Sequence, residues 1–102
     1  MSTLHTVNKS PFERPSLKTC LDHVVQGDAI LLIEDAVVGA RKGGAFAEAL
    51  SHKQASCGIY VLAPDLAARG IKAEDIAEGI ALVDYGGFVD LAAGKARVCA
   101  WL

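Results

Sequence analysis

The sequence has no apolar run long enough to cross a membrane, although it is apolar for its size. Hydrophobic residues fill 52% of the 102 positions, but they occur in short runs, well below the ~18–20 consecutive residues that a transmembrane helix needs. The first residues are polar and no apolar segment follows them, so no secretory signal peptide is expected. These absences predict a cytoplasmic protein without a membrane anchor.

The sequence also has few cysteines and a small net charge. The three cysteines, Cys20, Cys57 and Cys99, are an odd number without a C-x-x-C spacing, which disfavours both a disulfide framework and a zinc site. Reduced thiols in a reducing compartment are expected instead. A net charge of −2 provides no general attraction to nucleic acid, so direct RNA binding is not expected.

The sequence contains neither of the common nucleotide-binding motifs. Both G-x-G-x-x-G and G-x-x-x-x-G-K-[ST] are missing. The segment 39–44 is rich in glycine and basic residues, but it does not stand directly between a strand and the start of a helix. A flexible surface loop is therefore favoured there over a phosphate loop, and no cofactor is expected.

Strand-like and helix-like segments alternate along the chain. Five apolar segments are expected to be strands: 4–7, 29–33, 58–62, 80–83 and 97–102. Helical segments are expected between them, with Ser16 capping the first and Gly27 ending it. Either two short helices or a helix and a loop are expected within 36–50, followed by helical turns at 66–69 and 73–78 and a last helix opened by Asp84. This alternation predicts one three-layer α/β domain over residues 1–102, with a mostly parallel sheet of about five strands.

The apolar excess is difficult to bury in so small a domain. A chain of this length has much surface for its volume. The excess therefore predicts a surface that a partner covers, and self-association when the chain is alone.

Cys20 is the candidate reactive residue. Four apolar residues of its helix share one face, which predicts burial: Leu17, Cys20, Leu21 and Val24. Cys20 lies at the edge of this face near the helix start, where the helix dipole stabilises a thiolate. Lys18 is close in sequence and His23 lies one turn further on. A buried core residue and a reactive thiol are both open interpretations, while Cys57 and Cys99 are expected to be structural.

Acidic residues follow three of the expected strands, where ligands of parallel sheets bind. Asp35, Asp65 and Asp84 are suited either to Mg²⁺ or to capping the helices that follow them, and capping is favoured. Among the other polar and aromatic residues, His5 is expected to be a hydrogen-bonded core residue. Trp101 is expected to dock onto the sheet of its own domain.

The order and spacing of several segments resemble the DsrH/TusB family of sulfur-relay proteins. The resemblance extends over nearly the whole chain and rests on LHTVNKSP at 4–11, YVL at 60–62, DL and RG within 65–70, VDY and FVDL within 83–91, and AWL at 100–102. The resemblance implies a DsrE/DsrF-like α/β/α fold.

The resemblance also implies a function. Such a chain would be a non-catalytic or auxiliary subunit of a heterohexamer with DsrE/TusD-like and DsrF/TusC-like subunits. The complex would pass persulfide sulfur to a DsrC/TusE-like acceptor, for sulfur oxidation or for 2-thiolation of the tRNA wobble uridine. The main sulfur-carrying cysteine would lie on the DsrE/TusD-like subunit. Cys20 matches a position where DsrH-type members carry a cysteine and TusB-type members often lack one, which favours the sulfur-oxidation branch and a role for Cys20 as an auxiliary sulfur acceptor. The alternative is a flavodoxin-like regulatory domain that binds Mg²⁺ or a small ligand.

Overall fold

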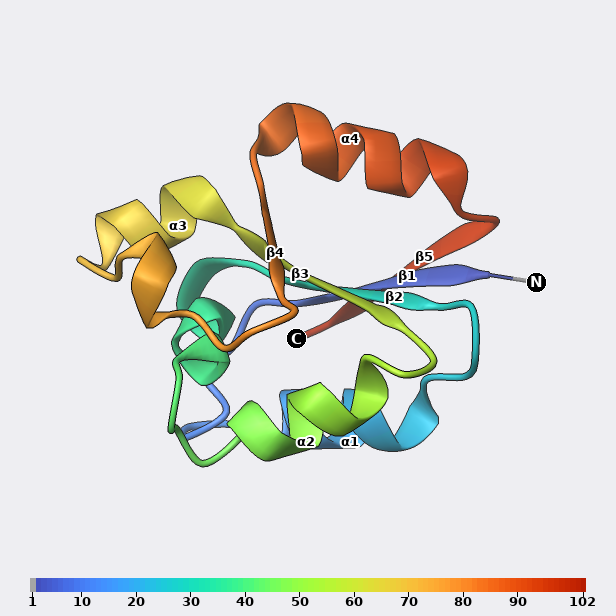
Figure 1. Cartoon of the computed structure of the whole chain (residues 1–102). Coiled ribbons are helices and arrows are strands. Elements are labelled where there is room, and N and C mark those ends of the chain that lie inside the picture. Colours follow the sequence, from blue (N-terminus) through green and yellow to red (C-terminus); the bar gives the residue numbers. More distant parts are fainter. Residues whose placement is uncertain (1) are drawn as a thin grey trace.

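The chain forms a sheet of five parallel strands (Figure 1). The computed structural model describes residues 2–102. The strands are β1 (Thr3–Val7), β2 (Ala29–Leu32), β3 (Gly58–Leu62), β4 (Ala81–Val83) and β5 (Arg97–Trp101). Their order across the sheet is β4-β3-β2-β1-β5, and every neighbouring pair is parallel. The predicted parallel α/β sheet is confirmed, and β1 pairs with both β2 and β5.

Helices cover both faces of the sheet. The helices α1 (Ser16–His23) and α2 (Ala47–Lys53) lie on one face, and α4 (Tyr85–Gly94) lies on the other (Figure 1). Three further helical elements lie beyond strand ends: the 3₁₀ helices η1 (Glu34–Ala40) and η2 (Ala73–Asp75), and α3 (Ala63–Ala68). The predicted three-layer fold is confirmed. Within residues 2–102, no helix is both long and apolar enough to span a bilayer.

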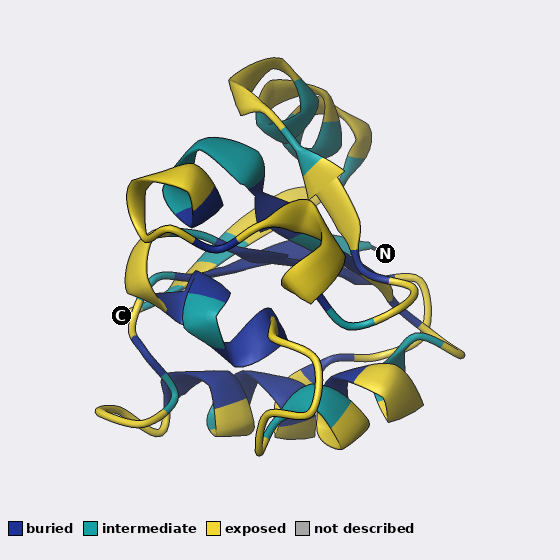
Figure 2. Ribbon diagram, turned by 60° about the vertical axis from the view of Figure 1, so that its left-hand side comes forward, coloured by how far each residue is buried: buried dark blue, intermediate teal, exposed yellow. Residues whose placement is uncertain are grey.

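The two faces of the sheet are buried to different extents. On the α1/α2 face, a large buried cluster joins the sheet to both helices and to η1; its members without any exposed surface include Leu17, Ile30, Leu32, Val37 and Leu50. On the α4 face, only Leu4, Ala29 and Leu31 form the buried cluster. Figure 2 shows the difference, because α4 carries no dark blue.

The first helix begins and ends differently from the prediction. Pro15, not Ser16, occupies the N-cap position, and no side chain caps the helix. The Ser16 hydroxyl instead donates to the carbonyl oxygen of Leu102 at 2.9 Å. The helix ends at His23, and Gly27 adopts a φ of 91° in the turn that follows. The Ser16 hydroxyl therefore binds an acceptor far away in the sequence and does not cap the start of α1.

The segment between β2 and β3 forms two short helices, η1 and α2, which is one of the two arrangements that its glycines predicted. Glu34 starts η1 with a φ of 50°, and its N–H donates to a carboxylate oxygen of Asp65 at 2.6 Å. The glycine-rich segment after η1 was expected to be a flexible loop. It is anchored instead, because Arg41 forms an antiparallel bridge with Ile76 and the Lys42 N–H donates to the carbonyl oxygen of Asp75 at 2.8 Å.

Candidate functional site

Cys20 lies in the core of the α1/α2 face. Its side chain has no exposed surface, and Leu17, Leu21 and Val24 are buried with it. The helical periodicity therefore predicted the buried face of α1 correctly. Cys20 is the fifth residue of the helix, beyond the first turn whose free N–H groups stabilise a thiolate.

The surroundings of Cys20 favour the protonated thiol. Burial raises the pKa of Cys20 to about 12, with smaller contributions in the same direction from Cys99, Cys57 and Asp28. Attack on a sulfane sulfur requires the thiolate. Sulfur acceptance by Cys20 would therefore require the packing around α1 to open.

The two polar neighbours of Cys20 in the sequence have other partners. The Lys18 ammonium lies 3.9 Å from a carboxylate oxygen of Asp22. The Nδ1–H of His23 donates to the carbonyl oxygen of Thr19 at 2.8 Å, and the His23 ring stacks at a tilt near Trp101, with 5.5 Å between centroids. Within residues 2–102, neither side chain hydrogen-bonds the sulfur of Cys20. The one-turn spacing of Cys20 and His23 therefore brings no hydrogen bond to the thiol, and the His23 Nδ1–H is engaged by Thr19.

The other cysteines also have structural positions. Cys57 is buried, and its thiol donates to the carbonyl oxygen of Val25 at 3.3 Å. Cys99 is half-buried on β5, paired in register with His5 of β1. All three thiols are free.

A buried polar network connects β1, β5 and the residue before β2. The indole N–H of Trp101 donates to Nδ1 of His5 at 3.0 Å. Because Nδ1 accepts, the proton of the neutral imidazole sits on Nε2, which donates to Asp28 at 2.9 Å. The prediction of His5 as a hydrogen-bonded core residue is confirmed. So is the docking of Trp101 onto the sheet of its own domain.

Asp28 is the buried residue that sequence reasoning missed. It also accepts the backbone N–H groups of Thr3 at 3.0 Å and Val25 at 3.2 Å. Burial acts to raise the pKa of Asp28, but the hydrogen bonds from His5, Val25 and Thr3 outweigh it and lower the pKa below its usual value. The available signal was an acid directly before the apolar run of β2.

The acidic residues at the strand ends have roles in capping and ion pairing. Asp84 caps α4, because its carboxylate accepts the N–H of Gly87 at 2.7 Å. Asp35 pairs with Arg69 at 2.8 Å. Asp65, within α3, binds the start of η1. Capping of the following helix is thus confirmed for Asp84 and wrong for Asp35 and Asp65, which lie inside helical segments. In the described part of the chain, no three His, Cys, Asp or Glu residues are grouped to hold a metal ion.

The sequence matches a known protein family over most of its length. A model of the family described as DsrH like protein matches residues 9–98, and the chain belongs to this family. Its relatives include Protein TusB of Pectobacterium parmentieri, 39% identical over 98 residues, covering 96% of this chain and 99% of that protein. Protein TusB of Escherichia coli K12 is 35% identical, with the same coverage. The family predicted from the sequence is confirmed.

Solved structures with the same fold are known at low sequence identity. The crystal structure of the ychN protein from E. coli aligns with a TM-score of 0.81 over 98% of this chain and 99% of that chain. The structure of MTH1491 from Methanobacterium thermoautotrophicum, a protein of unknown function, aligns with a TM-score of 0.73, covering 96% of this chain and 97% of the other. Both are 15% identical to this chain and support the fold alone.

Proposed function

We propose that this chain is a subunit of a cytoplasmic sulfur-relay complex that serves 2-thiolation of the tRNA wobble uridine. The observation that carries the proposal is the match to proteins named TusB over 96% of the chain. That name favours the tRNA branch over the sulfur-oxidation branch, which the sequence left open. By its resemblance, the chain would assemble with DsrE/TusD-like and DsrF/TusC-like subunits.

The chemistry of such a relay is thiol exchange. An acceptor thiolate attacks the terminal sulfur of a donor persulfide, a new S–S bond forms, the old one breaks, and the donor leaves as a thiolate. The step is balanced without an external oxidant. We assign the main carrier cysteine to the DsrE/TusD-like subunit and a structural and docking role to this chain. The buried, protonated Cys20 supports that division.

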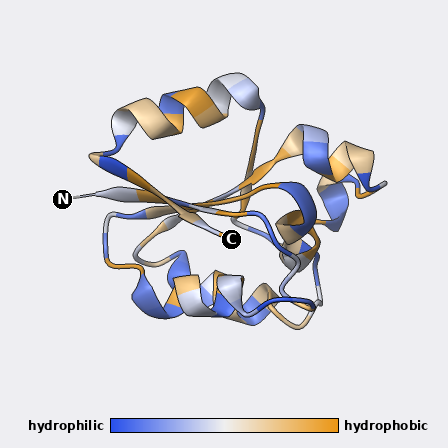
Figure 3. Ribbon diagram, turned by 180° about the vertical axis from the view of Figure 1, so that it is seen from behind, coloured by the Kyte–Doolittle hydropathy of each residue, from blue (hydrophilic) through white to orange (hydrophobic). Residues whose placement is uncertain are grey.

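The α4 face supports a role in assembly. None of the described residues of α4 is buried, and Figure 3 shows a strongly hydrophobic stretch along that helix. Apolar side chains remain exposed on α4 and on β5: Tyr85 at 60%, Val89 at 66% and Val98 at 50%. In an assembly, another subunit would cover these exposed apolar side chains.

Reconstitution tests the assembly. The chain would be produced alone and together with the TusC-like and TusD-like proteins of the same genome, and native mass spectrometry would report the species formed. Self-association of the isolated chain and one defined complex with both partners are expected. A stable monomer that ignores both proteins would contradict the proposal.

The role of Cys20 is tested in the assembled complex. Cys20→Ala is expected to leave persulfide transfer to a TusE-like acceptor unchanged, because the thiol is buried and protonated. The matched control replaces the carrier cysteine of the TusD-like subunit and should abolish transfer. Loss of transfer with Cys20→Ala, together with a persulfide found on Cys20 by peptide mass spectrometry, would establish it as an auxiliary acceptor instead.

A further inference from the structure

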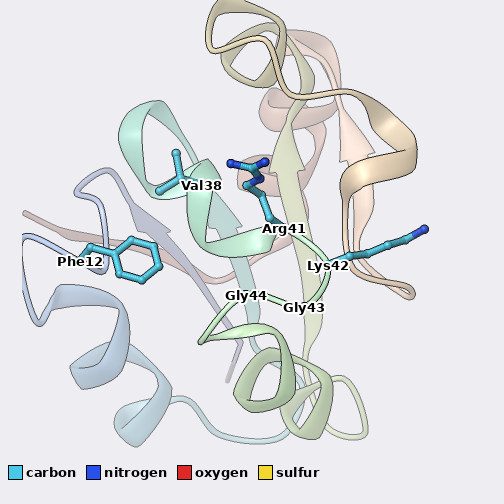
Figure 4. Close-up of a pocket in the computed structure, with 6 residues that line it drawn as sticks. All are labelled: Phe12, Val38, Arg41, Lys42, Gly43 and Gly44. Carbon is cyan, nitrogen blue, oxygen red and sulfur yellow. The ribbon is translucent and has the colours of Figure 1, made fainter.

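A cavity of about 340 Å³ lies between the loop that follows β1 and the segment that follows η1. Phe12 and Val38 provide its apolar wall, and the segment 41–44 provides the opposite wall (Figure 4). Both segments follow the carboxyl ends of parallel strands, where open α/β sheets bind their ligands. The volume is within the range of small binding sites.

The cavity is positively charged and has an aromatic surface. Among residues 2–102, no acidic side chain lines this cavity. By contrast, Asp22 lines a second cavity nearby, and Glu48 and Glu78 line a third. Within residues 2–102, the side chain of Arg41 forms no ion pair and no hydrogen bond. Phe12 is 65% exposed and stacks edge-on against Phe46, with 5.6 Å between ring centroids. Its ring points into the cavity (Figure 4).

The backbone of the wall that carries Arg41 is held in place before any ligand arrives. Beyond the bridge between Arg41 and Ile76, the Ala77 N–H donates to the carbonyl oxygen of Ala40 at 2.8 Å, and the Gly44 N–H donates to the carbonyl oxygen of Arg41 at 3.2 Å. Gly43 has a φ of 69°, which glycine adopts without strain. A wall fixed in advance lowers the entropy lost on binding.

We propose that this cavity is a docking site for an acidic peptide segment of a partner protein, with a carboxylate on Arg41 and an apolar side chain against Phe12 and Val38. A guanidinium binds carboxylates with two parallel hydrogen bonds. A nucleic-acid strand fits less well, because its backbone carries a negative charge at every nucleotide. Lys42 extends away from the cavity (Figure 4), which leaves the Arg41 guanidinium as the basic group for a single carboxylate. The proposal goes beyond sulfur relay and needs no thiol.

Fluorescence anisotropy with a labelled peptide of four glutamates around one phenylalanine tests the site. Arg41→Glu should weaken binding about tenfold through lost attraction and added repulsion. Arg41 is exposed, so the fold should tolerate the change. The matched control is Arg97→Glu, an equal change of charge at an exposed position of β5, and it should leave binding unchanged. Phe12→Ala should weaken binding of the same peptide without a change of charge.

Two further probes decide the class of ligand. The same peptide with glutamines in place of the glutamates should bind several-fold more weakly, and a short oligouridylate should bind more weakly than the acidic peptide. The proposal is overturned by absent binding of the acidic peptide, by equal binding to Arg41→Glu, by equal binding of the glutamine peptide, or by tighter binding of the oligouridylate. Because the isolated chain is used, such a failure would leave the sulfur-relay proposal intact.

Discussion

On the α1/α2 face of the sheet, side chains from strands and helices form a continuous buried core, whereas on the α4 face a single helix covers the strands only in part. Leu17 of α1 has no exposed surface, while Leu91 of α4 is only partly buried. Both are leucines on the sheet-facing sides of their helices. The α1/α2 face therefore provides the stability of the fold, and the α4 face leaves apolar surface for contact with another protein.

The largest expected effect is on the α1/α2 face. Leu17→Ala should lower the free energy of unfolding by about 3 kcal/mol, because it leaves a cavity in a closely packed core. Leu91→Ala should cost about 1 kcal/mol, because less surface is buried there. Urea denaturation of the two variants measures the difference. Equal losses would contradict the unequal packing of the faces.

An intermediate effect is expected at Asp28. Asp28→Asn should destabilise the protein by about 2 kcal/mol at neutral pH, since it removes the charge that three hydrogen bonds support. The control is Asp90→Asn at an exposed position of α4, which should change the free energy of unfolding little. Urea midpoints of the three proteins at neutral pH measure the effect.

The pH dependence of unfolding is a second test of the hydrogen-bond network around Asp28. The folded pKa of Asp28 is lower than its ordinary value of 3.8, so the stabilisation from this group is fully present above pH 3.8 and is lost as the pH falls through the folded pKa. The wild type should lose this contribution in acid, and Asp28→Asn should lack that part of the pH dependence. Parallel acid-denaturation curves would contradict the role of the carboxylate.

The smallest effect is expected on the α4 face. Asp84→Ala should cost about 1 kcal/mol, because the N–H of Gly87 loses its capping acceptor. Asp84→Asn keeps an oxygen acceptor and should recover most of the loss. Thermal unfolding compares the variants. A loss as large as that of Leu17→Ala would mean that α4 contributes to the core as strongly as α1 does.

Local patterns predicted most of the elements but not their assembly. The apolar run before Ile33 predicted β2, and the spacing of Leu17, Cys20 and Leu21 predicted the buried face of α1. The strand order was not predictable, because the pairing of β1 with β5 joins residues more than ninety positions apart. The misplaced cap at Ser16 has the same cause, since its acceptor, Leu102, is 86 positions away.

The candidate site was predicted only in part. The sequence singled out Cys20, but its periodicity placed the residue at the edge of the apolar face and left burial undecided. The thiol pKa depends on desolvation by elements distant in the sequence. Asp28 was missed because its role depends on the hydrogen bond from His5, which is 23 positions away in the sequence. The segment 39–44 was noted for its glycines and basic residues, but the cavity beside Arg41 was missed because Phe12, from the loop after β1, completes its lining.

The position of β1 between β2 and β5 has a consequence for synthesis. Strands β1 to β4 neighbour one another in the order in which the ribosome makes them, so each can pair soon after it emerges. The outer edge of β1 stays open until the segment 97–101 is available, and His5 lacks its indole donor for the same interval. An open strand edge can pair with a strand of another chain. The nascent protein is therefore most vulnerable to mispairing at β1, the first strand to be made.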